Sequence, residues 1–420
     1  MKIKIEFKKV LEIYLGVIAL GLVVLPKSIT LLIIGLGLII ITGYVLKKIS
    51  FQVNKIGITL ILFYGAYLVG VFFTNNPGQA AIYVENKLSF LIFPLLFFFK
   101  VREKVDVKYS YLGLILGVVI ISFIGLFDSY TCYFKPEGNF GCFLASVISP
   151  VHHPTYFTVF VLLSMCVAIH GWKQKMPYFS LYWIIPYILF YTVFQGLLLS
   201  LSGILFLFIL ISCIVIIWIK KKFGNIYFLI SIIVLPLLCF NIMVSIPQVE
   251  GEWGNAKWYA DEYLKNPDDF VSKRVYPMSG TETRIVMWTA AINGISHHPF
   301  GVGTGNVDEF LAKELTSLKQ VELIKYQYNP HNQFLQTALE IGVFGLIILV
   351  LFIAFTIVFA VKHKNWILLI VVTSLLFNSL FESMLQRQSG IVFYSFWICL
   401  LVFFTQNEKR IVSSKNDIVA

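Results

Sequence analysis

Long apolar runs alternate with short polar connections along almost the whole chain. Each run has about the length that a helix needs to cross a hydrocarbon core, roughly 17–25 residues. The runs centre near residues 10–25, 28–46, 55–74, 87–99, 111–128, 154–170, 179–198, 201–219, 225–245, 338–361, 365–383 and 389–406. The pattern predicts an all-α polytopic membrane protein with about twelve transmembrane helices. The fourth run is short, and we expect it either to tilt or to end in an interfacial helix over residues 76–85.

One polar stretch is much longer than the other connections, and it divides the chain into three parts. We expect about nine membrane helices over residues 1–245, a loop of short helices over 246–330 that carries part of a site, and about three further spans over 331–420. The composition agrees, since 58% of the 420 residues are hydrophobic and 13% are charged.

Basic residues gather in every second connection and so predict the orientation. The positive-inside rule assigns such clusters, and with them both termini, to the cytoplasm. The connections at about 128–153 and 245–329 are then external. The clusters lie at residues 2–9, 47–55, 100–108, 173–175, 220–222, 362–364 and 409–410. The net charge of +11 therefore reflects topology and indicates no nucleic-acid partner. The first apolar run has no small-residue cleavage site and predicts an anchor.

Two of the cysteines, Cys132 and Cys142, share an external loop. In an oxidising compartment they can form a disulfide, and two free thiols are the equal alternative. The chain contains no CxxC pair, and adjacent histidines such as His152 and His153 are poorly spaced for zinc, so we expect no metal site.

Arg284 is the first candidate site residue. Ser279 and Glu282 form the pattern of a capping box that opens a helix, and Arg284 follows in its first turn on the same face as Trp288. A guanidinium presents a planar fork that suits phosphate. The alternative is a structural salt bridge to a carboxylate of the loop.

The glycine-rich stretch HPFGVGTGN (residues 298–306, called the glycine turn below) follows. Glycines permit tight turns and close backbone approach, and Asn306 with Glu309 predicts the cap of the next helix. A glycine turn before a helix can bind an anion. Without a Walker motif or a strand–turn–helix context, the pattern favours a rigid connector between two helices.

His331 is the sharpest candidate. Asn329 can be an N-cap and Pro330 the first helical residue, which would place His331 in the first turn of a helix that runs to about residue 360. The positive helix end would keep the imidazole neutral and able to accept a proton. A hydrogen-bonded structural histidine is the alternative. This run of about thirty residues is too long for one perpendicular span, so its first turns should lie outside the hydrocarbon.

Other ionisable residues border the same side of the membrane. Glu340, Glu382 and Arg387 lie near external span ends, where ionisable groups are functional candidates and snorkelling is the alternative. Five of the seven histidines are also expected outside: His152, His153, His297, His298 and His331.

These motifs resemble the O-antigen ligase and O-antigen polymerase superfamily. His331-Asn332, nine residues and Gly342-Val343-Phe344-Gly345 look like its HN-x9-GxxG signature. The pattern R-x3-W-x2-A from Arg284, the glycine turn, and about twelve spans with one large late external loop are also similar. The resemblance covers the topology of the whole chain, and its specific motifs cover Arg284 to Gly345.

The resemblance implies a membrane glycosyltransferase of the GT-C type in the bacterial inner membrane, with its site in the periplasm and no cofactor. Such enzymes move a glycan from an undecaprenyl-pyrophosphate carrier. Ligases pass it to lipid A–core, which we expect here; polymerases pass it to another carrier-linked glycan, and relatives to protein. Inversion in a single, metal-independent displacement is expected. A polytopic lipid or solute transporter is the alternative from another class, although we see neither inverted repeats nor broken helices.

By position, the resemblance implies His331 as the catalytic residue and Arg284 as the contact of the pyrophosphate. Family members tend to carry a second arginine near the start of the span after the seventh, whereas residues 194–218 contain no Lys or Arg. We infer that Arg387 supplies this charge. Supporting roles are expected for the following residues: Asn332, Gly303, Gly305, His153 and His298.

Overall fold

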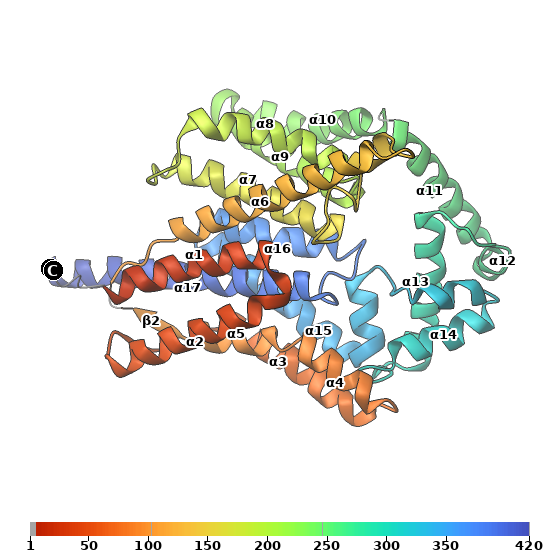
Figure 1. Ribbon diagram of the computed structural model, residues 1–420, viewed down its shortest axis with the longest axis horizontal. Helices are drawn as coiled ribbons and strands as arrows, with labels where there is room; N and C mark the ends of the chain where they lie inside the picture. The colour runs from red at the N-terminus through yellow and green to blue at the C-terminus, as the bar shows by residue number, and fades with distance from the viewer. Residues whose placement is uncertain (1–5, 102, 246, 420) are drawn as a thin grey trace.

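The computed structural model describes residues 6–101, 103–245 and 247–419, and helices dominate it (Figure 1). The helices of the first half are α1 (Phe7–Val24), α2 (Ile29–Val45), α3 (Lys55–Gly70), α4 (Pro77–Asn86), α5 (Ser89–Phe97), α6 (Lys108–Tyr133), α7 (Pro154–Lys173), α8 (Leu181–Leu197) and α9 (Leu201–Phe223). Those of the second half are α10 (Asn225–Val244), α11 (Pro247–Lys265), α12 (Pro267–Ser272), α13 (Gly280–His297), α14 (Val307–Ser317), α15 (Gln333–Lys362), α16 (Trp366–Asn378) and α17 (Gln388–Val419). Short 3-10 turns are η1 (Pro26–Ser28), η2 (Val71–Phe73), η3 (Phe140–Phe143) and η4 (Val321–Tyr326), and the two strands are β1 (Ile49–Phe51) and β2 (Phe99–Val101).

The all-α polytopic architecture predicted from the apolar runs is confirmed. Within the described ranges, nine helical segments are long and apolar enough to cross a membrane. The other three predicted spans also form helices, but α8 and α16 are shorter, and α1 carries the charged residues Lys8, Lys9 and Glu12. The fourth span combines α4 and α5 into one segment, Pro77–Phe97.

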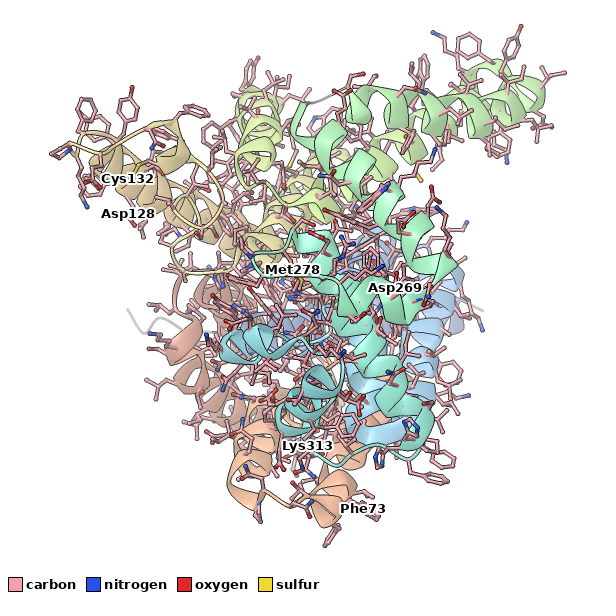
Figure 2. The ribbon with its side chains drawn as sticks, turned by 90° about the vertical axis from the view of Figure 1, so that its right-hand side faces the viewer. Phe73, Asp128, Cys132, Asp269, Met278 and Lys313 are labelled. Carbon is pink, nitrogen blue, oxygen red and sulfur yellow. A yellow bond between two sulfur atoms is a disulfide. The ribbon has the colours of Figure 1, made fainter. Side chains whose placement is uncertain are left out.

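The two ends of the bundle differ in character (Figure 1). At one end β1 pairs with β2, with Ile49 opposite Val101, which brings the basic clusters at residues 47–55 and 100–108 together. At the other end lie the helices α11 to α14. We call residues 247–330 the cap. Seen from that end, Asp269, Met278 and Lys313 lie over the bundle (Figure 2).

The cap has an apolar core of its own. Val286, Met287 and Ala290 of α13 are fully buried, and they pack in one cluster with Leu311 and Leu315 of α14. Leu339 of α15 completes this cluster. The core therefore fixes α13, which carries Arg284, against the outer part of α15.

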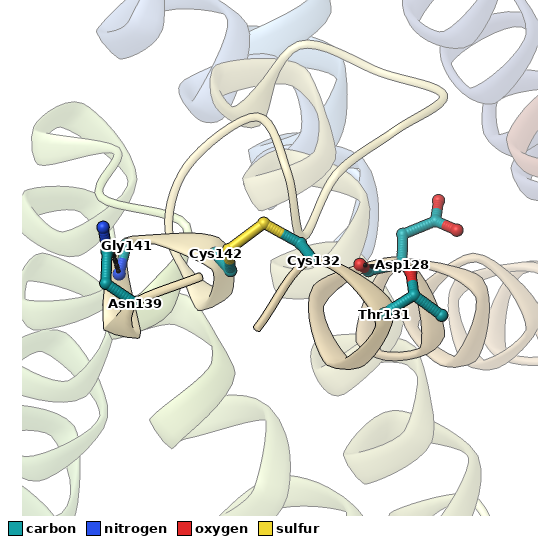
Figure 3. The surroundings of a disulfide bond; sticks show 6 residues. All are labelled: Asp128, Thr131, Cys132, Asn139, Gly141 and Cys142. Atoms are coloured by element: carbon teal, nitrogen blue, oxygen red, sulfur yellow. Dashed lines mark hydrogen bonds between the residues drawn. A yellow bond between two sulfur atoms is a disulfide. The ribbon is translucent and has the colours of Figure 1, made fainter. Parts of the chain in front are cut away.

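Cys132 and Cys142 form a disulfide, which decides between the two alternatives left open by the sequence. The bond joins the end of α6 to η3 across a Cα–Cα distance of 5.7 Å (Figure 3). The loop lies at the cap end of the molecule, at the edge of the view in Figure 2. Both long connections that the charge pattern assigns to one side of the membrane thus lie at the same end.

Helix α15 is broken rather than continuous, which the sequence did not predict. Ile341 and Gly342 depart from helical dihedral angles, and Gly342 has φ +73°. The glycine turn inserts at this break: the N–H groups of Val302 and Gly303 donate to the carbonyls of Leu339 (2.8 Å) and Glu340 (3.1 Å). The break places the first two turns of α15 in the cap region, separate from the membrane-spanning remainder.

Candidate active site

His331 lies just before α15, so the prediction that it occupies the first helical turn is wrong. The N-cap is Asn332, whose side chain accepts hydrogen bonds from the N–H groups of Phe334 (2.9 Å) and Leu335 (3.1 Å). Asn329 instead accepts from the N–H of His331 at 2.8 Å and closes a tight turn. His331 adopts φ +47° in this turn, an uncommon backbone conformation for a residue with a side chain. The helix-end argument for a neutral imidazole therefore does not apply.

Glu382 instead determines which nitrogen of the His331 ring carries a proton. Nδ1 of His331 lies 3.1 Å from Oε2 of Glu382, in the loop between α16 and α17 (residues 379–387). The other carboxylate oxygen accepts from the N–H of Ser383 at 3.1 Å. Burial by itself would raise the pKa of Glu382, but the hydrogen bond and charge of His331 and the N–H of Ser383 lower it below its usual value. An ionised Glu382 requires a proton on Nδ1, which leaves the Nε2 lone pair free to accept another.

The surrounding turn holds the ring in place. The hydroxyl of Ser383 donates to Asn329 at 3.0 Å, and the amide of Asn332 donates to the carbonyl of Leu380 at 3.2 Å. The side chain of His331 is 22% exposed to solvent. The imidazole is therefore oriented by the α16–α17 loop but remains accessible to a substrate.

Neither candidate arginine is tied up in a salt bridge. Arg284 is half-buried in the first turn of α13, after a capping box that forms as predicted. Its guanidinium donates to the carbonyl of Gly280 at 3.3 Å, and its Nε has no partner. The nearby carboxylate of Glu282 is taken by Arg274 at 3.1 Å. Among the residues described, no carboxylate lies within 4 Å of Arg284 or of the exposed Arg387, so both can receive an external anion.

His153 links these groups electrostatically. It is the exposed N-cap residue of α7. Its pKa is lowered, first by desolvation; the charge of Glu382 opposes this shift, and Arg387, His331 and Arg284 add to it. Helix α7 packs against α16 and α13 packs against α15, and His331 bonds to the α16–α17 loop. These contacts link the elements that carry the four groups.

The glycine turn is a packed connector, as its sequence pattern favours. The glycines at 301, 303 and 305 all have positive φ. A Cβ on Gly303 would lie 2.7 Å from the carbonyl oxygen of Phe73, and one on Gly305 would lie 2.6 Å from the N–H nitrogen of Ala80. Since the N–H of Gly303 already donates to α15, that group is not free to cradle a phosphate. Gly303 bonds to α15 and Gly305 packs against Ala80 of α4, so both hold the glycine turn in place.

The two end residues of the glycine turn, Asn306 and His298, differ from their predicted roles or surroundings. Asn306 precedes α14 but forms no side-chain cap; its carbonyl accepts from the hydroxyl of Thr74 at 2.7 Å, so the predicted cap is wrong. His298 lies in an open groove of about 490 Å³ with Phe73 and Phe310. His298 is not among the groups that influence His153.

Two features of this site were hard to find in the sequence. Glu382 stood out only as an ionisable residue near a span end, yet it is the partner of the candidate base. The polar residues of the first turns of α15 gave no signal at all, because a Gln or Thr in a helix resembles a solvated face. Within the described part of the chain, no three His, Cys, Asp or Glu side chains come together to hold a metal ion.

Comparison with known proteins supports the resemblance. Residues 187–350 match the family model described as O-antigen ligase. The resemblance to the ligase and polymerase superfamily is thereby confirmed, and the match contains both Arg284 and His331. A Haemophilus influenzae protein described as uncharacterized is 26% identical over 202 residues, which cover 45% of this chain and 49% of that protein. The matched part thus spans about half the length of this relative.

Family and architecture together give a coarse description. The apolar helices and the O-antigen ligase match indicate a multi-pass protein of the bacterial inner membrane. Lipid-linked glycans and glycan acceptors are the substrates that the family implies in general.

Proposed function

We propose that this protein transfers a glycan from an undecaprenyl-pyrophosphate carrier to an acceptor at the periplasmic face, and that lipid A–core is the acceptor. The observation that carries the proposal is the His331–Glu382 pair at 3.1 Å. Arg284 and Arg387, which have no carboxylate partner among the described residues, act electrostatically on the same His153 as this pair. A base and guanidinium groups without carboxylate partners suit the displacement of a pyrophosphate by a hydroxyl.

The reaction is a single displacement. The acceptor hydroxyl attacks the anomeric carbon, the bond between this carbon and the pyrophosphate oxygen breaks, and the configuration inverts. The hydroxyl proton passes to Nε2 of His331, while Nδ1–H remains bonded to the ionised Glu382. Arg284 and Arg387 stabilise the negative charge that grows on the leaving pyrophosphate.

In this mechanism the arginines supply the charge stabilisation that a metal ion provides in other transferases. Guanidinium–phosphate pairs are strong and geometrically specific. We therefore propose that transfer is independent of metals. We assign His153 a supporting role in substrate binding, because the charges of Glu382, Arg387, His331 and Arg284 all act on its ring.

The sidedness follows from charge. The basic clusters at residues 47–55 and 100–108 meet at the end opposite the cap, and the positive-inside rule assigns that end to the cytoplasm. The candidate site lies at the cap end, where a disulfide also forms. Disulfides persist in oxidising compartments such as the periplasm, so a second, independent observation supports a periplasmic site with both termini in the cytoplasm.

Polymerisation by the same site is the second candidate within the family, since only the acceptor differs. Reconstitution separates the possibilities. Purified protein in nanodiscs is given lipid-linked glycan with either lipid A–core or a second lipid-linked glycan, and products are weighed by mass spectrometry. Transfer to lipid A–core is expected. Chain extension on the carrier alone would establish the polymerase, and transport into liposomes without any transfer would overturn the enzymatic proposal.

A further inference from the structure

A buried ion pair lies beneath the candidate site, in a region that the mechanism above does not use. Lys87, between α4 and α5, is 1% exposed, and Glu340, in the second turn of α15, is 0% exposed. The ammonium nitrogen lies 4.0 Å from Oε1 of Glu340. It also sits over the rings of Tyr67 and Tyr83, at 4.5 Å and 4.9 Å from their centroids.

Gln386 joins this pair to the α16–α17 loop. Its carbonyl accepts from Nζ of Lys87 at 2.9 Å, and its amide donates to Oε2 of Glu340 at 2.9 Å. Gln386 directly precedes Arg387 and follows Glu382 by four residues. Both ends of its amide are thus used by the two charges of the pair, which leaves it one orientation.

The first turns of α15 bond to the same loop at further points. The N–H of Gln333 donates to the carbonyl of Ser379 at 2.8 Å, and its side-chain carbonyl accepts from the N–H of Leu385 at 2.6 Å. Gln336 donates to Oε2 of Glu340 at 3.3 Å. The loop that carries Glu382 and Arg387 is therefore bonded near its start and near its end to one face of α15.

Stability alone does not explain this arrangement. Desolvation of two charges costs so much that apolar side chains of similar volume often stabilise a protein equally well or better. In this network Oε1 of Glu340, 4.0 Å from the ammonium, accepts no hydrogen bond, whereas Oε2 accepts from Gln386 and Gln336. A displacement of the loop would remove Gln386 from both buried charges, and a buried charge that loses a hydrogen-bond partner is costly. The Lys87–Glu340 pair is in the right place to fix the loop in one position.

We propose that Lys87, Glu340 and Gln386 form a clamp that positions Arg387 and Glu382 for glycan transfer. The clamp residues are positioning residues, since none of them touches the reacting atoms. The proposal rests on the proposed function for its effect on rate, but the fixed loop position that it asserts can be measured without any reaction.

The decisive variant removes both charges at once. Lys87→Met combined with Glu340→Leu replaces the pair by apolar side chains, so no unpaired charge stays buried, and its melting temperature is measured beside its transfer rate. Lys313→Met is the matched control, because Lys313 also pairs with a glutamate, Glu309 at 2.7 Å, but on the exposed surface of the cap. Gln386→Leu is the second variant, because it leaves the ion pair in place and cuts only its link to the loop.

The expected result is a loss of kcat/KM on the order of 10- to 100-fold in both clamp variants, the range for a small misplacement of catalytic groups, and no loss in the control. In an Arg387→Ala background, Gln386→Leu should lower kcat/KM by a much smaller factor than it does in the wild-type background. The clamp would be overturned if Lys87→Met with Glu340→Leu transferred glycan at the wild-type rate with an unchanged melting temperature. It would also be overturned if the effects of Gln386→Leu and Arg387→Ala on kcat/KM were fully additive in free energy.

Amide hydrogen exchange tests the same proposal independently of transfer. Exchange of residues 379–387 should rise in both clamp variants and stay unchanged in Lys313→Met. If the wild-type protein transfers no glycan, the proposed function fails while this measurement still decides on the clamp. Unchanged exchange of residues 379–387 in both variants would overturn it, whatever the transfer assay shows.

Discussion

Glu382→Gln is the most informative single substitution at the proposed site. The side chain keeps its size and loses its charge. In the protein the carboxylate accepts a hydrogen bond from Nδ1–H of His331 at 3.1 Å. An amide can turn its NH2 group toward Nδ1, which would move the ring proton to Nε2 and remove the lone pair that must accept the acceptor's proton.

The size of the effect follows from this contact. A hydrogen bond to a charged group contributes about 1.5–3 kcal/mol. Each 1.36 kcal/mol corresponds to a tenfold change in rate, so the loss of orientation alone predicts a rate about 10- to 150-fold lower. The assay is single-turnover transfer by purified protein in nanodiscs with saturating donor, so that product release does not mask the chemical step.

Glu322→Gln is the matched control. Glu322 pairs with Lys325 on the exposed cap surface at 2.8 Å, and its substitution should leave the transfer rate within about twofold, because exposed ion pairs contribute little. A transfer rate of Glu382→Gln equal to that of this control would refute the reasoning that Glu382 sets the tautomer of His331.

Glu382→Gln should also change how the melting temperature depends on pH. The pKa of Glu382 is lowered in the folded protein from its usual 4.5. The ionised group therefore contributes stability above pH 4.5, and this contribution is lost as the pH falls through the folded pKa. The difference in melting temperature between wild type and Glu382→Gln should be largest at neutral pH and shrink below pH 4.5. A difference that grows as the solution is acidified would show that the carboxylate is not stabilised by His331.

Three further predictions concern the anion site, metals and topology. Arg284→Lys should lower kcat/KM at least about tenfold despite the retained charge, because lysine lacks the bidentate fork, and Arg387→Ala should also impair transfer; full activity of Arg387→Ala would exclude the second phosphate contact. Transfer should survive excess EDTA in a purified assay, and activity that disappears with chelator and returns with one divalent metal would contradict the arginine-based mechanism. An impermeant maleimide should label a cysteine at position 279 in intact cells and not one at 221; the reverse pattern would invert the orientation.

The fold was largely predictable because apolar periodicity and basic clusters are local features of the sequence. Twelve apolar runs predicted where helices would form, and each of the twelve forms a helix. Among the described residues, nine helical segments are long and apolar enough to span a membrane. The capping box at Ser279 and Glu282 was also predictable, because both partners lie within four residues of each other.

The start of α15 shows where such local reasoning fails. Asn329 and Asn332 are equally good caps by residue type, and Pro330 favoured the first of them. The second wins in the structure, where Asn332 also donates to the carbonyl of Leu380, almost fifty residues away in the sequence. The prediction relied on the local pattern, whereas the helix begins three residues later because Asn332 has an additional tertiary contact.

The contacts that define the candidate site are long-range, so the sequence alone could not supply them. His331 and Glu382 are 51 residues apart, and Lys87 and Gln386 are 299 apart. The signature glycines likewise acquire a physical role only in three dimensions: Gly342 breaks α15 where the glycine turn inserts, and a Cβ there would lie 2.4 Å from the backbone of Phe300. Residue types identified the candidates, and packing revealed their partners.

The central claim is that His331 accepts the acceptor's proton during glycan transfer. The most direct test is His331→Ala in the purified protein, assayed for transfer from lipid-linked glycan beside His297→Ala, an exposed cap histidine whose ring bonds to the carbonyl of Asn293 in its own helix. The account predicts a rate about 10²–10⁴-fold lower for His331→Ala, with an unchanged elution profile and with His297→Ala at the wild-type rate. Transfer by His331→Ala within a few-fold of wild type would contradict the account.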